Sequence, residues 1–473
     1  MAEETKTRFI PQWKNPRTEP NEADPQERVK SFTEVDLGFS VQDAIAEANR
    51  CLDCAKPLCV PGCPVQIDIP TFIRQIREED FEGALATIKK TNMFPSVCGR
   101  VCPQEVQCEG ACILNKRSTP IAIGQLERFL GDMAPEIGEA PVCAMPIGKK
   151  VAVIGAGPSG LACAGELSRR GYSVVVYEAL HQGGGVLSYG IPEFRLPADI
   201  VARELDDLCD IDVTIELDSV GGRLFTAEEL LEEEGFSAVY IAVGAGLPIF
   251  MGIPGENANG VFSANEFLTR VNLMHANEFP AYDTPVIRGK KFVVVGGGNV
   301  AMDAARTALR MGADSVKLMY RRTVDEMPAR RAEVHHAQEE GIEFFTLTAP
   351  IEVLTDDYGF VNGITYERME LGEPDESGRR RPVRIEDSAE SMECDVVIVA
   401  IGTRSNPQVP LMSPDLETTD RGYIMTNDRG RTSVEGVWAG GDIVTGAATV
   451  ILAMGAGRQA AADIDEWIQE NDK

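Results

Sequence analysis

Eight of the twelve cysteines lie in two groups within the first quarter of the chain. In a long chain without an export signal, such density indicates metal or redox chemistry rather than disulfides. The first group, Cys51 to Cys63, has the spacing CxxCxxxxCxxxC followed by proline, which is typical of iron–sulfur ligation. Paired cysteines also bind zinc, so the spacing alone leaves both metals open. The four scattered cysteines are expected to be buried structural thiols: Cys143, Cys163, Cys209 and Cys394.

A glycine-rich turn follows the cysteine region, in KKVAVIGAGPSGLACAGELSRRGYSVVVYEA. Gly155, Gly157 and Gly160 form GxGxxG between a predicted strand and helix. The first glycine allows a tight turn, the second lets a pyrophosphate approach, and the third lets helix and strand pack closely. The helix N-terminus attracts phosphates through its free amides and dipole. Glu178 ends the next strand, where a carboxylate binds ribose hydroxyls, so this turn predicts FAD or NAD.

The same unit recurs about 140 residues later, in KKFVVVGGGNVAMDAARTALRMGADSVKLMYRR. Its turn runs from Gly296 to Asn299, and Ala301 takes the third small position. No acid ends the second strand; Arg321 and Arg322 stand there instead. Guanidinium groups bind a 2′-phosphate that a carboxylate would repel, so the second copy predicts NADP(H). The alternative is that both arginines lie on a solvated loop.

A glycine–aspartate turn near the carboxyl end indicates which dinucleotide the first copy binds. Gly441 and Asp442 end a predicted strand, and a carboxylate there can bond the ribityl chain of a flavin. The helix that starts near Thr449 would aim its positive end at the flavin edge that gains negative charge on reduction. The first site is therefore predicted to hold FAD, with nicotinamide stacked on it for hydride transfer. Because zinc is redox-inert, a flavin in the same chain also favours iron–sulfur clusters at the cysteines.

The elements that position these residues change character near residue 146. Before it, apolar residues keep helical spacing, with Ser40 as a plausible N-cap; after it, apolar strands alternate with helices. The predicted fold class is α/β with an N-terminal all-α domain, a helical ferredoxin-like domain followed by two nested Rossmann-like domains for FAD and NADPH. The predicted boundaries are an arm at 1–40, the iron–sulfur domain at 41–145, FAD-binding parts at 146–280 and 393–473, and the NADPH domain at 281–392.

The composition and the absent motifs exclude several classes of function. With 74 acidic and 45 basic residues, the formal net charge of −29 repels nucleic acid and anionic lipid. There is no apolar run of roughly 20 residues and no signal peptide, so we expect a cytoplasmic protein with no nucleic-acid or membrane partner. No Ser/His/Asp or Cys/His nucleophile arrangement is evident, so no catalytic side chain is predicted. The histidines are expected at the surface rather than on a metal.

Longer motifs resemble a known family. RCLDC, CGRVCPQ, IAIGQLERF, GAGPSGLACA, GGVLSYGIPEFRLP, GGGNVAMDAAR, YRR and AGGD look like the small (beta) subunit of NADPH-dependent glutamate synthase, in order from about residue 40 to the carboxyl end. EALHQGGGVLSYGIPEFRLP, SANEFLTRVNLM and MPARRAEVHHAQEEGIEF resemble more closely a sub-branch of this family, often labelled homotetrameric NADPH-dependent glutamate synthase. That sub-branch contains the large subunit of the electron-bifurcating NADH-dependent ferredoxin:NADP oxidoreductase and the FAD subunit of sulfide dehydrogenase. The amino-terminal half of dihydropyrimidine dehydrogenase is similar too.

The resemblance implies two interleaved 4Fe–4S sites, where spacing alone would divide the cysteines into four plus four. One cluster would be held by Cys51, Cys54, Cys59 and Cys112, and the other by Cys63, Cys102, Cys108 and Glu127. Cys98 would be spare, and Glu127 stands where relatives can carry glutamine. As an anionic ligand, Glu127 should make its cluster harder to reduce. The alternative for Glu127 is an ordinary surface acid on a helix.

The resemblance also implies the nucleotide contacts. For FAD these are Gly155, Gly157, Gly160, Glu178, Gly184, Arg195, Gly441, Asp442 and Thr449. For NADPH they are Gly297, Gly298, Asn299, Arg321, Arg322 and Gly402.

The predicted function is an oxidoreductase subunit that carries electrons between NADP(H), FAD, two 4Fe–4S clusters and a partner. Glutamate synthesis also needs a glutaminase centre and an FMN barrel, so a glutamate synthase large subunit would have to supply them. The other predicted partner is a small FAD/2Fe–2S subunit, with ferredoxin as a further partner, and the sub-branch motifs favour this pairing. The alternative from a different class is a non-catalytic scaffold of an electron-transfer complex.

Overall fold

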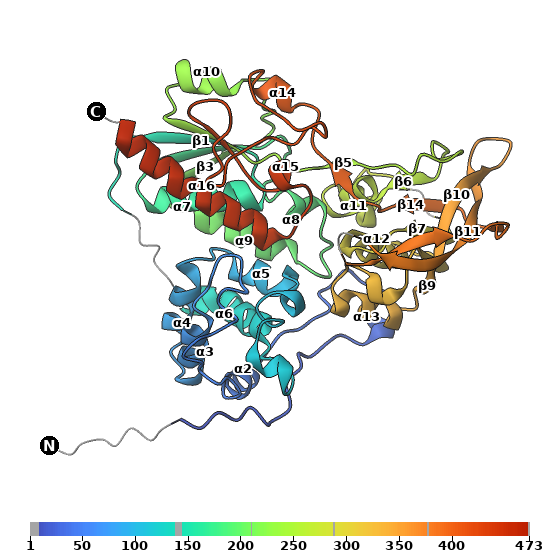
Figure 1. Cartoon of the computed structure of the whole chain (residues 1–473), viewed down its shortest axis with the longest axis horizontal. Coiled ribbons are helices and arrows are strands. Elements are labelled where there is room, and N and C mark those ends of the chain that lie inside the picture. Colours follow the sequence, from blue (N-terminus) through green and yellow to red (C-terminus); the bar gives the residue numbers. More distant parts are fainter. Residues whose placement is uncertain (1–8, 138–143, 210, 287–288, 376–377, 472–473) are drawn as a thin grey trace. The chain divides into compact units, whose positions relative to one another are not determined.

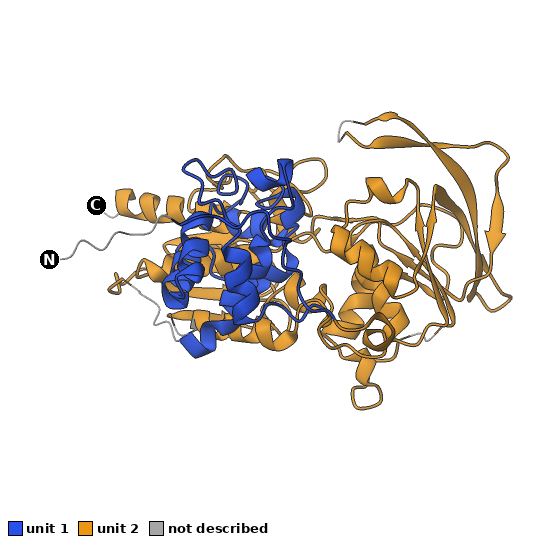
Figure 2. Ribbon diagram, turned by 90° about the horizontal axis from the view of Figure 1, so that it is seen from below, with its two compact units in different colours: residues 1–22, 36–143, 449–455 blue, residues 23–35, 144–448, 456–473 orange. Residues whose placement is uncertain are grey.

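The computed structural model describes residues 9–137, 144–209, 211–286, 289–375 and 378–471 (Figure 1). Contacts divide the chain into two compact units, coloured separately in Figure 2. Unit 1 comprises the described residues of 1–22, 36–143 and 449–455, and unit 2 those of 23–35, 144–448 and 456–473. Among the residues that the structure describes, no helix is long and apolar enough to cross a membrane.

Unit 1 is built from helices, as the apolar spacing of this region predicts. Ser40 is the N-cap of the first one: its hydroxyl accepts the Asp43 N–H, and the Asp43 carboxylate accepts the Ser40 N–H. This reciprocal capping box satisfies two amides that the helix itself leaves unpaired. The helical elements are α2 (Val41–Ala48), α3 (Ile69–Arg77), α4 (Phe81–Lys89), α5 (Pro95–Val101), η1 (Gln104–Val106), η2 (Ile113–Lys116) and α6 (Ile123–Ile137).

Helices α5 and α6 pack so closely that glycine is required at the contact. A Cβ added to Gly99 would lie 2.6 Å from the backbone nitrogen of Arg128, and one added to Gly131 would lie 2.5 Å from that of Ser96. Neither neighbour is a flexible side-chain end, so any larger residue would push the helices apart. This contact fixes the cysteines at the end of α5 against the face of α6 that carries Glu127.

Unit 2 contains a first parallel sheet in the order β16-β4-β1-β2-β3. Its strands are β1 (Lys150–Ile154), β2 (Ser173–Tyr177), β3 (Val213–Glu216), β4 (Ala238–Ile241) and β16 (Val437–Ala439). The four residues after Lys150 in β1 are all buried, as its unbroken apolar run predicts for a parallel strand covered on both faces. The helices of this half are α7 (Pro158–Arg169), α8 (Val186–Tyr189), α9 (Ala198–Cys209), α10 (Ala227–Glu232), α14 (Val409–Met412), α15 (Asp442–Thr445) and α16 (Val450–Asn471), of which residues 450–455 belong to unit 1.

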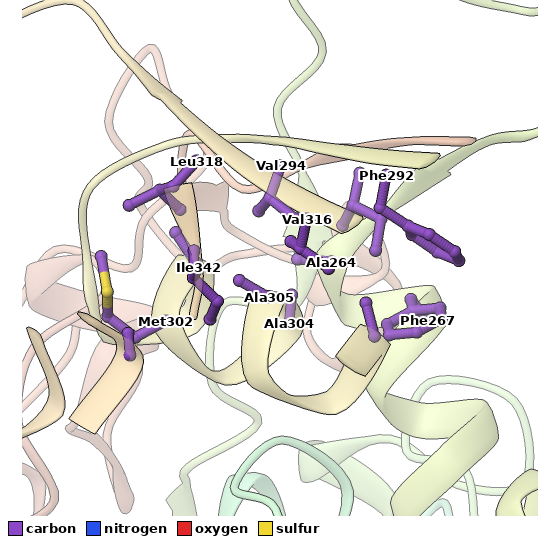
Figure 3. Packing of buried hydrophobic residues seen from close by; sticks show 14 of the residues in the cluster. Ala264, Phe267, Phe292, Val294, Met302, Ala304, Ala305, Val316, Leu318 and Ile342 are labelled. Carbon is purple, nitrogen blue, oxygen red and sulfur yellow. The ribbon is translucent and has the colours of Figure 1, made fainter. Parts of the chain in front are cut away.

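A second parallel sheet repeats this plan in the order β6-β14-β7-β8-β9. Its strands are β6 (Val261–Ser263), β7 (Lys291–Val295), β8 (Ser315–Tyr320), β9 (Glu343–Thr346) and β14 (Val396–Val399), and its helical elements are α11 (Ala264–Asn272), η3 (Ala276–Glu278), α12 (Asn299–Arg310), η4 (Val324–Glu326) and α13 (Arg331–Glu339). Figure 3 shows Val294 and Leu318 of this sheet facing Ala304 and Ala305 of α12, all of them fully buried. The small residues let α12 lie close to the sheet. In both sheets the strand before the glycine turn, β1 or β7, is central.

An antiparallel sheet is inserted in the second half of unit 2. It comprises β10 (Thr348–Thr355), β11 (Val361–Pro374), β12 (Arg380–Arg384) and β13 (Glu390–Met392). The strands β5 (Leu247–Pro248) and β15 (Thr403–Arg404) pair separately, and α1 (Pro25–Arg28) belongs to unit 2 as well. The predicted fold class is confirmed, whereas the sequence analysis did not foresee this insert. The residue boundaries of the predicted domains stay predictions, and residues 1–8 of the predicted arm lie outside the described range.

Candidate functional site

The first predicted cysteine quartet lies together in unit 1. Cys51, Cys54, Cys59 and Cys112 line one pocket, whose wall is otherwise mostly apolar. Burial, with smaller contributions from the neighbouring thiols, raises the pKa of Cys51 to about 11 and that of Cys59 to about 12. Crowded thiols of this kind resist ionisation until a cationic group compensates their charge, which is what iron–sulfur ligation supplies. Cys112 joins three cysteines more than 50 residues before it, as the resemblance implies and the spacing alone does not.

The second predicted quartet also assembles. Cys63, Cys102, Cys108 and Glu127 are all buried, with relative exposures between 5% and 7%. Burial, with the charge of Glu127 as a further cause, raises the pKa of Cys63 to about 11. Burial, with the charges of Glu109 and then Glu127 as further causes, raises the pKa of Cys108. Glu127 is therefore not a surface acid, and its charge lies among three thiols. No group of three His, Cys, Asp or Glu side chains in the described ranges is arranged to hold a single metal ion.

A hydrogen-bonded amide lies between the second quartet and the spare cysteine. The Nδ2 group of Asn92 donates to Oε1 of Glu127 at 2.5 Å, and Asn92 Oδ1 accepts from the Cys98 thiol at 3.6 Å. The Cys98 sulfur also lies 3.6 Å from Sδ of Met454. Asn92 is not predictable from the sequence, since a lone asparagine in TNMFP carries no motif. Cys163 and Cys394 are buried as expected, while Cys143 and the Cys209 side chain lie outside the described part of the chain.

The first glycine turn in unit 2 meets its steric requirements. Gly155 has φ +109°, and a Cβ there would lie 2.5 Å from the carbonyl oxygen of Ala242. A Cβ on Gly160 would lie 2.0 Å from the carbonyl oxygen of Gly155. A Cβ on Gly157, by contrast, would meet nothing within 4 Å. The protein itself thus requires the first and third glycines, and the open space at the second fits a dinucleotide pyrophosphate at the start of α7.

Two further predicted FAD residues lie at this turn. The Gly184 N–H donates to the Ala156 carbonyl at 2.8 Å, which brings the 183–185 glycines beside the turn. The carboxylate of Glu178 accepts the N–H of Ala156 at 2.8 Å and that of Leu180 at 2.9 Å. These bonds hold the carboxylate at the end of β2, where it is 7% exposed.

The carboxyl-terminal residues show a third part of the predicted FAD site. Gly441 has φ +74°, and Asp442 Oδ1 accepts the Ala448 N–H at 3.2 Å. Burial raises the pKa of Asp442. Burial, with smaller contributions from the charges of Asp442 and Glu178, raises the pKa of Tyr189 to about 12, so this phenol lies near both carboxylates. Thr449 falls in unit 1, where its hydroxyl accepts the Leu452 N–H at 3.4 Å, and its contact with FAD stays a prediction.

Arg195 has partners that the sequence analysis did not foresee. Its Nη1 lies 2.6 and 2.7 Å from the two oxygens of Asp303 on α12, and its Nε lies 3.1 Å from Glu333 on α13. The guanidinium therefore ties the PEFRLP segment of the first half to two helices of the second half. Arg195 stays a predicted FAD residue, and its charge is already shared between Asp303 and Glu333.

The second glycine turn repeats the geometry of the first. Gly298 is the N-cap of α12 with φ −93° and ψ 178°, and Gly157 is the N-cap of α7 with φ −84° and ψ 178°. A Cβ on Gly298 would meet only the Pro328 side chain, at 4.0 Å, so this position is open too. A Cβ on Gly297, however, would lie 2.6 Å from the Tyr320 ring.

The remaining predicted NADPH residues lie on loops around this turn. The side-chain oxygen of Asn299 accepts the Arg330 N–H at 2.8 Å, which ties the turn to the loop before α13. Gly402 has φ +117°, and a Cβ there would approach Ile249 no closer than 3.8 Å.

The two arginines at the end of β8 have different surroundings. Arg321 is exposed, and its side chain has no ion-pair partner among the residues that the structure describes. Arg322 is 5% exposed: it donates to Asp375 at 2.6 Å and to the Arg380 carbonyl at 2.7 Å. Asp375 lies in the antiparallel insert, 53 residues later, so no local motif could reveal it. Of the two, Arg321 has the guanidinium that is open to a 2′-phosphate.

Two phosphate turns on parallel sheets, with cysteine quartets in the same chain, define a nicotinamide-dependent flavin oxidoreductase with an iron–sulfur domain. The family model described as dihydropyrimidine dehydrogenase domain II, 4Fe-4S cluster, matches residues 28–139, and that of the pyridine nucleotide-disulphide oxidoreductases matches residues 149–460. The chain is 38% identical over 461 residues to the glutamate synthase [NADPH] small chain of Halomonas elongata, covering 96% of each chain. It is 37% identical over 446 residues to that of Escherichia coli, covering 93% of this chain and 94% of the relative. The chain therefore belongs to the family of the NADPH glutamate synthase small chain.

A solved structure supports the fold. FprA of Mycobacterium tuberculosis, in complex with NADPH, superposes with a TM-score of 0.57 at 21% identity, covering 68% of this chain and 85% of FprA. The predicted family, the fold class, the NADPH-dependent FAD oxidoreductase activity and the cofactors FAD, NADP(H) and 4Fe–4S are thus confirmed. The zinc and scaffold alternatives are not supported. The individual ligand and nucleotide residues stay predictions.

Proposed function

We propose that this chain is the NADPH-linked subunit of a larger electron-transfer complex. Its role would be to carry electrons between NADP(H) and a partner subunit, in either direction. The observation that carries the proposal is the presence, in one chain, of two open phosphate turns and two quartets of ligand-type side chains, one half-buried and one buried. When bound, FAD exchanges a hydride with NADP(H) and single electrons with 4Fe–4S clusters.

The nucleotide residues of unit 2 are proposed to bind and orient the two dinucleotides. The open Gly157 and Gly298 positions, each at a helix N-terminus, would receive the pyrophosphates. Glu178, held by two backbone amides, would accept bonds from the adenosine ribose, and Asp442 would accept bonds from the ribityl chain. Arg321 would bind the 2′-phosphate that distinguishes NADP(H) from NAD(H).

The residues of unit 1 are proposed to hold two clusters with different ligand charge. The quartet around Cys59 supplies four thiolates, and the quartet around Cys63 supplies three thiolates and the Glu127 carboxylate. The second set is buried, which limits side reactions of reduced iron, whereas the four cysteines of the first set are half-buried. Replacing Glu127 by alanine tests the second assignment, because an unchanged iron content and EPR spectrum would refute ligation.

The partner is proposed from two lines of support that point in different directions. The two relatives are named as small chains of glutamate synthase and match nearly their whole length, which supports a large glutamate-forming subunit. The sub-branch motifs support a small FAD/2Fe–2S subunit and ferredoxin, and we favour this pairing. Isolation of the native complex decides between them. By the usual 100–200 residues per domain, a partner of roughly 1,500 residues would mean glutamate synthase and one of roughly 280 the ferredoxin oxidoreductase.

The enzymatic role is tested on the isolated full-length chain. Anaerobically prepared protein with FAD and iron should reduce an artificial electron-accepting dye with NADPH. Absence of dye reduction in fully loaded protein would contradict the proposed role and favour a scaffold.

A further inference from the structure

Asn92 is a fully buried polar side chain beside the proposed second cluster. It is 0% exposed and follows α4, where its backbone N–H donates to the Ile88 carbonyl at 2.9 Å. Its side chain reaches Glu127 on α6, which lies 35 residues later in the sequence. Because the backbone is anchored and the surroundings are packed, the amide cannot swing away without breaking several contacts.

The direction of the hydrogen bond to Glu127 is determined by a second contact. The backbone N–H of Phe94 lies 3.0 Å from Oδ1 of Asn92, and a backbone N–H can only donate. The amide oxygen must therefore face Phe94, and the Cys98 thiol approaches the same oxygen. The NH2 group is left to face Glu127, so the donor at 2.5 Å is Asn92 and the acceptor is the carboxylate.

The hydrogen bond from Asn92 is compatible with Glu127 acting as a carboxylate ligand. A carboxylate has two oxygens that only accept when it is ionised, so it can accept from Asn92 and bind iron at once. The donated bond restricts the rotation of the Glu127 side chain and draws negative charge away from the ligand oxygen. It therefore offsets part of the difficulty of reduction that the anionic ligand imposes.

We propose that Asn92 is a positioning residue that orients Glu127 for the second cluster and raises the reduction potential of that cluster. This inference rests on the proposed ligation of iron by Glu127. Asn92 itself would touch no iron; it would act only through the carboxylate. Cys98 acquires a role as well, as the thiol that holds the amide oxygen of Asn92, which accounts for a buried cysteine outside both quartets.

The experiment uses the full chain, reconstituted anaerobically with iron and sulfide. Asn92→Leu keeps the approximate size and removes the donor to Glu127, and Asn92→Ala removes the same donor without adding a charge. Thr87→Val is the matched control, since Thr87 is 5% exposed and donates a hydrogen bond to Gln75 at 2.9 Å rather than to a proposed ligand. Iron content, the EPR spectrum and the midpoint potential of each cluster are measured.

In both Asn92 variants the signal of the second cluster should change and its reduction should become less favourable by about tenfold, which is about 59 mV for one electron. The first cluster should keep its spectrum and midpoint, and the Thr87 variant should resemble the wild type in both clusters. Selective loss of the second cluster in the Asn92 variants would support the same role.

Two results distinguish a failure of the proposed ligation by Glu127 from a failure of the proposed role of Asn92. If Glu127→Ala leaves the second cluster intact, the proposed ligation is wrong and the role of Asn92 falls with it. If Glu127→Ala removes that cluster while Asn92→Leu behaves like Thr87→Val, ligation stands and the inference about Asn92 is overturned.

Discussion

The two nucleotide halves of unit 2 share a backbone and differ in the side chains at its edge. Both place an open glycine at the N-cap of a helix with nearly the same dihedral angles. In the first half the strand ends in Glu178, which two backbone amides hold in place. In the second half it ends in an exposed Arg321 and an Arg322 that Asp375 holds. Steric requirements therefore set the shared turn, and we propose that charge at the strand end sets which nucleotide is accepted.

The halves also differ in how much buried charge they carry. Around α12 and α13, the side chains of Arg28, Arg195, Arg306, Asp303, Glu333 and Glu340 form a buried network of ion pairs. Such pairs contribute little net stability while complete, but losing one partner leaves an uncompensated buried charge. The second half is therefore expected to be the more sensitive to charge substitutions and to acid.

The largest effect is expected at Arg195, where the two halves are joined. Arg195→Met leaves Asp303 and Glu333 without their shared cation, which should cost about 3–5 kcal/mol of folding stability. Thermal and denaturant unfolding measure this cost. Asp303→Asn is the control: if Arg195 acts by joining the halves, both variants lose stability and keep FAD. Loss of FAD in Arg195→Met alone would instead establish the predicted contact with the flavin.

The acid sensitivity of the network is the next prediction. Burial opposes ionisation of Glu340, but hydrogen bonds from Arg306 and Arg310 outweigh it and lower its pKa from 4.5 to about 2. A lowered folded-state pKa gives stability that is present above pH 4.5 and is lost as the pH falls towards 2; for Glu340 this is about 3 kcal/mol. Glu340→Gln should be less stable at pH 7 and show a shallower loss between pH 4.5 and 2 in denaturant titrations. An acid limb as steep as that of the wild type would contradict this assignment.

These contacts show where sequence reasoning ends. The glycine turns, the strand ends and the fold class follow from local pattern, because sterics and hydrophobic burial act on neighbouring residues. The partners of Arg195 and Arg322 do not, since Asp303, Glu333 and Asp375 reach them from elements 50 or more residues away. Cys112 likewise lies beside Cys51 although it is 61 residues away in the sequence, and only the family resemblance indicated this grouping.

The next effect concerns nucleotide binding in the second half, and it is expected to be smaller than the losses of stability predicted for Arg195 and Glu340. Arg321→Ala should weaken NADPH binding by roughly 10- to 100-fold, the value of one or two charge-assisted bonds, and leave NADH binding nearly unchanged. Arg322→Ala should have a smaller effect if its bond to Asp375 persists when NADPH binds. Steady-state KM values for both nucleotides measure the difference. An equal loss of NADPH binding and NADH binding would show that Arg321 does not recognise the 2′-phosphate.

The smallest effect on stability, and the sharpest test of the shared turn, is expected at the two open glycines. The methyl group of Gly157→Ala would meet no atom within 4 Å, and that of Gly298→Ala would meet only Pro328, at 4.0 Å. Both glycines have negative φ. Each substitution should therefore change the unfolding free energy of the cofactor-free chain by less than about 1 kcal/mol. Each should nevertheless weaken its own nucleotide, FAD for Gly157 and NADPH for Gly298, because the added methyl takes the space of a phosphate. Flavin content and NADPH titration are measured on both variants: Gly157→Ala should lose only FAD binding, and Gly298→Ala only NADPH binding. A variant that binds both nucleotides normally would mean that its turn does not hold the pyrophosphate.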